Sequence, residues 1–129
     1  MEDLERGRLL EAIKLVSSVK GSNMEREFLS LARRLPTLLM SSGLLLTAAY
    51  LQKRSKEKKE DSSENRILEF MKDWFKRKKL IPQDNEDKRD LLNHLLELEP
   101  LKLSILYDEA IWIAEALKIV AEAMLEGES

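Results

Sequence analysis

The chain has 129 residues, of which 43% are hydrophobic and 36% are charged, and its net charge is −2. This length predicts one domain with a substantial hydrophobic core. Because there is no cysteine, the sequence excludes a disulfide framework, a thiolate metal site and a cysteine nucleophile. The N-terminal segment lacks the continuous apolar core of a signal peptide, so we expect a cytoplasmic protein.

The charges are distributed unevenly along the chain. Residues 1–51 carry a net charge of +1, residues 52–79 carry +5, and residues 80–129 carry −8. Such asymmetry favours a polyanion or an acidic partner on the basic part of the molecule and a different partner on the acidic part.

The periodicity of the apolar residues predicts an all-α fold, with no strand. We expect a single helical domain over residues 1–129, built as a compact bundle of about six helices around a buried central helix. The first helix is expected from Glu2 to Lys20 and a second from Asn23 to Leu35. The apolar stripe of the first helix is formed by Leu9, Ala12, Ile13, Val16 and Val19.

The central helix is predicted from the uncharged stretch Leu35–Leu51. Its apolar residues fall on every side of a helical wheel, which is typical of a helix buried on all sides. Pro36 suits a first helical turn, so we expect a break between this helix and the preceding one. A membrane span needs about 20 mostly apolar residues. The stretch is shorter and contains Ser41, Ser42 and Thr47, so the buried helix is favoured.

The polar segment 53–63 follows the central helix and contains no apolar residue. It is expected to form a solvated helical extension and then a polar linker. Ser63 is predicted to cap a fourth helix, which ends before Pro82. The inward-facing residues of this helix are Ile67, Phe70, Met71 and Trp74.

Two further helices complete the expected bundle. A fifth begins at Asp84 or Asn85, and its apolar face consists of Leu91, Leu92, Leu95 and Leu98. Pro100 opens the last helix, whose a/d stripe is Leu103, Leu106, Ala110, Ile113, Leu117, Val120 and Met124. This stripe predicts packing along another helix over its full length, most economically along the central one.

Candidate catalytic and metal-binding residues are few. His94 follows Asp90 by four residues, so it could be an oriented general base or an ordinary histidine beside a leucine ridge, and we favour the second. Glu109, Glu115 and Glu122 lie on the last helix without a Glu-x-x-His pair, which favours a solvated acidic face. The sequence therefore predicts a protein that is not an enzyme, with no metal, cofactor or small-molecule substrate.

Clustered basic residues are the remaining candidates for a site. Such residues could contact phosphates without reading a sequence, or they could be a solvated face partly neutralised by Glu57 and Glu60. The first cluster is Lys53, Arg54, Lys56, Lys58 and Lys59, and the second is Lys72, Lys76, Arg77, Lys78 and Lys79.

Two stretches resemble a known family. Within LPTLLMSSGLLLTAAYL, the matching residues are Pro36, Gly43, Leu44, Thr47, Tyr50 and Leu51. Within YDEAIWIAEALKIVAEAMLE, they are Tyr107, Glu109, Ala110, Lys118, Ala121 and Ala123. The chain resembles the small subunit of the type III-B CRISPR (Cmr) RNA-targeting effector complex in these motifs, in length and in helix order.

This resemblance implies a non-catalytic, all-helical subunit in antiviral defence. A few copies would stack head to tail as a minor filament beside the backbone subunits, and the groove between the filaments would accommodate the guide and target RNA. The basic middle could then face RNA while the acidic end meets a neighbouring subunit. The alternatives are a helical protein–protein adaptor with no nucleic-acid role, a small enzyme, or a membrane-associated protein.

Overall fold

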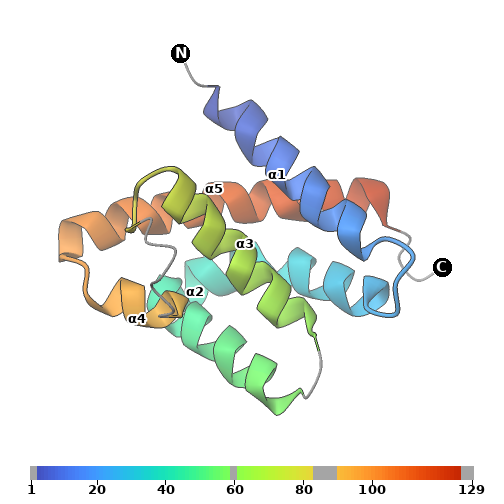
Figure 1. Cartoon of the computed structure of the whole chain (residues 1–129), viewed down its shortest axis with the longest axis horizontal. Helices are drawn as coiled ribbons and strands as arrows, with labels where there is room; N and C mark the ends of the chain where they lie inside the picture. Colours follow the sequence, from blue (N-terminus) through green and yellow to red (C-terminus); the bar gives the residue numbers. More distant parts are fainter. Residues whose placement is uncertain (1–2, 59–60, 83–89, 126–129) are drawn as a thin grey trace.

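The computed structural model describes residues 3–58, 61–82 and 90–125, and these residues form helices and no strand (Figure 1). The all-α prediction is confirmed. The helices are α1 (Leu4–Val19), α2 (Glu25–Glu57), α3 (Ser63–Arg77), α4 (Leu91–Leu96) and α5 (Pro100–Met124). The described residues form five helices, whereas about six were predicted. The difference arises because the predicted second helix and the predicted central helix are both part of α2.

The break in α2 lies at Gly43 and not at the predicted position before Pro36. Pro36 is buried inside the helix, whereas Gly43 has φ 83° and ψ 171°, which is not a helical conformation. Residues with a Cβ rarely adopt this region. The hydroxyl of Thr47 donates to the carbonyl of Leu38 at 3.2 Å and so bridges the bend. The two halves of α2 consequently run in different directions (Figure 1).

The prediction that Leu35–Leu51 is buried on all sides is wrong. Leu35, Leu39, Leu44, Ala48 and Leu51 are buried, but 57% of Met40 and 66% of Leu46 are exposed. By length and composition alone, α2 is the one helix of the described residues that could cross a membrane, and 39% of its most apolar window is buried inside the fold.

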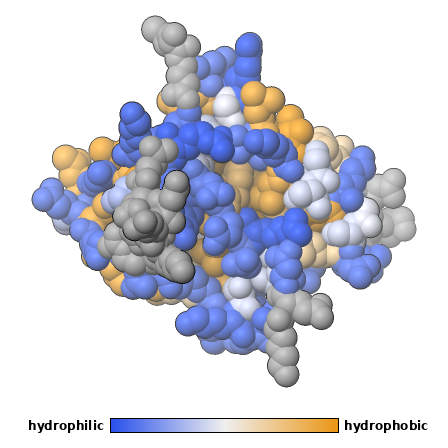
Figure 2. All heavy atoms as spheres, viewed as in Figure 1, coloured by the Kyte–Doolittle hydropathy of each residue, from blue (hydrophilic) through white to orange (hydrophobic). Residues whose placement is uncertain are grey.

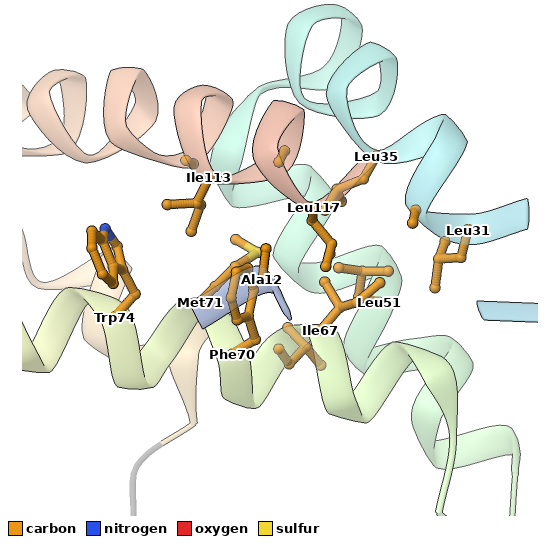
Figure 3. Packing of buried hydrophobic residues seen from close by; sticks show 14 of the residues in the cluster. Ala12, Leu31, Leu35, Leu51, Ile67, Phe70, Met71, Trp74, Ile113 and Leu117 are labelled. Carbon is orange, nitrogen blue, oxygen red and sulfur yellow. The ribbon is translucent and has the colours of Figure 1, made fainter. Parts of the chain in front are cut away.

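The core lies between α2 and α5, and neither helix alone is central. Helix α2 packs against α5, α3 and α4, whereas α1 packs mainly against α5. The predicted stripe of α5 does face the core: Leu106, Ala110, Ile113, Leu117 and Val120 are buried. Figure 3 shows Ile113 and Leu117 of α5 opposite Ile67 and Met71 of α3. Helices α1 and α3 therefore cover a core that α2 and α5 share.

Local capping explains where three helices begin. Asp3 caps α1 by accepting from the backbone N–H of Arg6 at 3.1 Å. Ser62, not the predicted Ser63, caps α3 by accepting from the backbone N–H of Asn65 at 3.1 Å. Both serines are buried, so this end of the polar linker is not solvated as predicted.

The fifth predicted helix is present as α4, which is short and begins only at Leu91 in the described residues. Its N-cap is Asp90, whose carboxylate accepts from the backbone N–H of Asn93 at 2.9 Å. Asp84 and Asn85, the predicted starting residues, lie outside the described residues.

Candidate nucleic-acid interface

The first basic cluster occupies the C-terminal turns of α2. Lys53, Arg54 and Lys56 are exposed there, and Lys58 follows the last helical residue, while Lys59 lies outside the described residues. Glu57 is 4.0 Å from the amino group of Lys53 and 3.6 Å from the guanidinium of Arg54. The expected partial neutralisation by this glutamate is therefore present.

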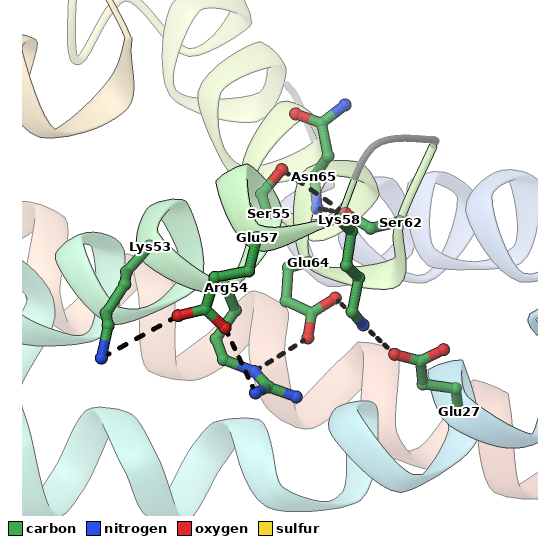
Figure 4. A network of polar contacts seen from close by, with 9 residues as sticks. All are labelled: Glu27, Lys53, Arg54, Ser55, Glu57, Lys58, Ser62, Glu64 and Asn65. Atoms are coloured by element: carbon green, nitrogen blue, oxygen red, sulfur yellow. Dashed lines mark hydrogen bonds and ion pairs between the residues drawn. The ribbon is translucent and has the colours of Figure 1, made fainter.

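Lys58 lies between two carboxylates that come from distant parts of the chain (Figure 4). Its amino group donates to Oε1 of Glu64 at 2.8 Å and also pairs with Glu27. Arg54 reaches the other oxygen of Glu64, with Nε and Oε2 3.7 Å apart. These contacts connect the two halves of α2 to the start of α3, so Lys58 and Arg54 stabilise the fold.

The pKa values of Glu64 and Lys58 are both shifted toward the charged form of the side chain. Burial alone would raise the pKa of Glu64, but hydrogen bonds from Lys58 and its own backbone N–H, with the charges of Lys58 and Arg54, hold it below the ordinary value. Burial would likewise lower the pKa of Lys58, but its hydrogen bonds with Glu27 and Glu64 raise it above the ordinary value. Lys58 and Glu64 therefore form an ion pair at neutral pH.

The second basic cluster lies at the end of α3. Arg77 pairs with Glu11 of α1, and the amino group of Lys78 lies 4.7 Å from the centre of the Trp74 ring. A cation at this distance is attracted to the negative face of the indole. Lys79 has a positive φ of 61° in the turn that ends α3, and its side chain is exposed.

The structure separates the two clusters but connects them by a groove. Glu64, beside the first cluster, and Arg77, in the second, are thirteen residues apart on α3, which corresponds to about 20 Å. Lys56 and Lys72 line the same groove of about 200 Å³, between α2, α3 and α4. One lysine of each cluster therefore lies in this groove, and the two clusters do not form a continuous patch.

Four lysines of the predicted set make no ion pair with any described residue. These lysines, which we call the free lysines, are Lys56, Lys72, Lys76 and Lys79. Lys56 and Lys79 are exposed, and Lys72 and Lys76 are partly exposed. Their amino groups are therefore available to contact phosphates.

A partly buried polar cluster that the sequence did not indicate joins α1, α3 and α5. Arg8 donates to both carboxylate oxygens of Glu109, at 2.7 and 2.9 Å, and the indole N–H of Trp74 donates to Glu109 at 3.0 Å. The hydrogen bond with Glu109 raises the pKa of Arg8, although burial opposes it. Only 14% of the Glu109 side chain is exposed, so the prediction of a solvated acidic face is wrong at this residue.

Asp90 and His94, for which the sequence favoured an ordinary histidine over a general base, lie at the start of α4 and within it. His94 is 2% exposed. The carboxylate of Asp90 caps α4 and also accepts from the side-chain amide of Gln52 at 3.2 Å. Within residues 3–58, 61–82 and 90–125, no group of three or more histidines or carboxylates could hold a metal ion.

An apolar groove of about 550 Å³ lies where the bend of α2 meets the start of α5. Its lining includes Leu44, Leu45, Leu46, Pro100, Leu103 and Tyr107. Nearby, Leu101 and Ile105 are 76% and 50% exposed. Figure 2 shows apolar surface at the end of the molecule where α5 begins. Apolar side chains that are exposed next to one another are a common feature of contacts between proteins.

Comparison with known proteins places the chain among CRISPR-associated proteins. The model of the family described as CRISPR-associated protein (Cas_Cmr5) matches residues 4–124. A search of curated proteins finds no match. The crystal structure of a CRISPR-associated Cmr5 family protein from Thermus thermophilus is similar, with a TM-score of 0.74 and 19% identity over 97% of this chain and 100% of that chain. The family match confirms the resemblance found in the sequence: the chain belongs to the Cas_Cmr5 family of CRISPR-associated proteins.

Proposed function

We propose that this chain is a non-catalytic structural subunit of a type III-B (Cmr) RNA-guided, RNA-targeting effector complex in the cytoplasm. Several copies stack head to tail as a minor filament and contact the backbone of the guide and target RNA. Membership in the Cas_Cmr5 family supports association with the other Cmr subunits. The apolar groove beside Leu46 supports a role in protein contacts.

The observation that supports RNA contact is the set of free lysines on α2 and α3. Amino groups that make no ion pair with the described residues can bind phosphates without a competing internal partner. Such contacts are independent of sequence, which suits a complex in which base pairing provides the specificity. A few contacts per copy are weak at physiological salt, but several copies in a row gain affinity through avidity.

The experiment compares the wild-type effector complex with two variants of it. In the test variant, the free lysines are all changed to glutamate: K56E, K72E, K76E and K79E. Arg77 and Lys78 stay unchanged because they contact Glu11 and Trp74 within the fold. A matched control carries the same charge change on lysines outside the two clusters: K14E, K20E, K102E and K118E. Retention of labelled target RNA and assembly of the complex are both measured.

We expect the test variant to assemble but to lose most of its contribution to target-RNA retention, while the control retains RNA. The proposal is contradicted if the test variant assembles and retains RNA like the wild type. A further variant, L46E, tests the apolar groove. If L46E prevents assembly while the test variant assembles and retains RNA, a helical adaptor that does not touch RNA is favoured, because only the apolar groove is then required for assembly.

A further inference from the structure

Helices α1 and α5 each carry a row of exposed apolar side chains. On α1, Ile13 follows Leu9 by four residues and Leu10 by three, so the three side chains lie around one face of the helix. On α5, the exposed residues Ile105, Trp112 and Ile119 recur every seven residues, which is close to two helical turns. Neither row belongs to the core that α2 and α5 share.

The two rows lie side by side. Helix α1 packs mainly against α5 and crosses it (Figure 1). Arg8, the neighbour of Leu9, forms two hydrogen bonds with Glu109, and its guanidinium carbon lies 5.5 Å from the centre of the Trp112 ring. The α1 row therefore adjoins the α5 row at Trp112. We call the six residues of the two rows the α1–α5 face.

The α1–α5 face is large enough for a specific contact between proteins. Trp112 and Ile119 are 60% and 59% exposed, and the other four side chains are between 38% and 57% exposed. From these fractions the face presents roughly 600 Å² of apolar surface, so two copies that cover each other bury about 1,200 Å², the lower end of the range for specific interfaces. Tryptophan is also among the residues that most often dominate binding.

The charges beside the two rows favour a second copy of the chain as the partner. Carboxylates that recur every seven residues border the α5 row on one side, and basic residues lie around the α1 row. The carboxylates are Asp108, Glu115 and Glu122, and the basic residues are Arg6, Lys14 and Lys20. Two α5 rows facing each other would bring like charges together, whereas α1 of one copy on α5 of the other brings opposite charges together.

The basic residues of α1 are held only loosely within their own chain. Arg6 lies 3.6 Å from Asp3 and Lys14 lies 3.9 Å from Glu11, and both carboxylates are three residues away on the same chain segment. More than 70% of each of these two basic side chains is exposed. Exposed pairs of this kind contribute little to stability, so the two side chains are able to pair with another molecule.

We propose that two copies of the free chain form a closed dimer in which the α1 row of each copy packs on the α5 row of the other. A two-fold axis that runs within the interface, between α1 and α5, places each helix opposite the other helix of the second copy, so both copies use the same face. Such a contact ends at two copies. Head-to-tail stacking, in contrast, joins two different surfaces and continues. Because the dimer needs neither RNA nor another subunit, it goes beyond the proposed function.

The first test measures the association of the purified full-length chain by sedimentation equilibrium at concentrations from about 1 to 100 μM. The variant L10Q/I119Q removes one apolar side chain from each row. The matched control M40Q/L46Q replaces two similarly exposed apolar side chains of α2, outside the α1–α5 face. Glutamine is a good helix former, and thermal unfolding followed by circular dichroism checks that each variant folds.

We expect the wild type and M40Q/L46Q to approach the mass of a dimer, and L10Q/I119Q to raise the dissociation constant by roughly tenfold or more. A wild type that stays monomeric over the whole concentration range overturns the inference. A dimer that is lost in M40Q/L46Q and kept in L10Q/I119Q also overturns it, because the contact then lies at the apolar groove. Association that continues beyond two copies contradicts a closed dimer.

The second test asks which helices meet. R6E/K14E makes the surroundings of the α1 row acidic, and D108K/E115K makes those of the α5 row basic. Each variant alone then places like charges opposite each other, and we expect its dimer to be weakened. An equimolar mixture is expected to form heterodimers, because the acidic α1 meets a basic α5 and the basic α1 meets an acidic α5. If the mixture associates no better than either variant alone, α1 does not pack on α5 of the second copy, and the inference is overturned.

Discussion

At the scale of single residues, Glu64 shows how a basic run becomes part of the fold. Only 5% of its side chain is exposed, and Lys58 and Arg54 supply the positive charge that a buried carboxylate requires. Residues that a composition analysis assigns to a solvated or RNA-binding face thus divide into two groups. Lys58 and Arg54 stabilise the chain, and the free lysines remain available for a ligand.

The E64Q substitution is expected to lower the free energy of unfolding at pH 7 by about 1–3 kcal/mol, because it removes a charged hydrogen-bond acceptor from Lys58. The pKa of Glu64 is lower in the folded protein than its ordinary value of 4.5. The ionised carboxylate therefore contributes fully to the free energy of unfolding above pH 4.5, and this contribution is lost as the pH falls from 4.5 through the lowered pKa. Urea unfolding of wild type and E64Q from pH 7 to pH 3 tests this.

The difference in the free energy of unfolding between wild type and E64Q should therefore become smaller below pH 4.5. E57Q, at a glutamate whose side chain is 51% exposed, should change stability by less than about 0.5 kcal/mol. A difference between wild type and E64Q that stays constant down to pH 3 would show that the ionised carboxylate is not what stabilises this site.

The sequence could identify which residues are charged, but not which of them meet. Lys58 and Glu27 are 31 residues apart, and Arg8 and Glu109 are 101 residues apart. No local pattern encodes such pairs, because they depend on how the helices pack. The sequence likewise did not show that Arg54 lines one groove with Arg26, Arg33 and Arg34, because these residues come from the two halves of the bent helix α2.

At the scale of helices, apolar periodicity and capping residues predicted most of the elements. Pro100 opens α5, and the stripe from Leu106 to Val120 is buried as expected. The position of the break in α2 was wrong because proline has a helical φ and removes only one N–H, so the helix continues through Pro36. The change of direction instead comes from a glycine whose backbone conformation other residues rarely adopt.

The G43A substitution tests this account of α2. A Cβ on Gly43 would meet no atom within 4 Å, so the expected cost arises from the positive φ and not from a clash. We expect a loss of about 1–3 kcal/mol in the free energy of unfolding, measured with urea. The control S42A changes an exposed neighbour and should shift stability by less than about 0.5 kcal/mol. If Gly43 were part of a regular helix, alanine would instead stabilise the protein by about 1 kcal/mol.

At the scale of the whole molecule, different surfaces have different chemistry. The free lysines form a basic surface, whereas the groove that Leu46 helps to line is apolar. Neither surface follows from the length or the net charge of the chain, since the total charge is only −2. The uneven distribution of charge along the sequence predicts separate partners, and this stays a prediction. The described residues of the two basic clusters lie at the end of α2 and at the end of α3 or within it.

The most direct test of the central claim is purification of the tagged protein from its native cell, divided into RNase-treated and untreated halves. Bound proteins are identified by mass spectrometry, and bound RNA is sized on a gel. We expect the other Cmr subunits together with a short RNA of discrete length, and we expect the protein partners to persist after RNase treatment. Recovery of the protein alone, or with unrelated partners and no RNA, would contradict its assignment as a subunit of an RNA-guided effector complex.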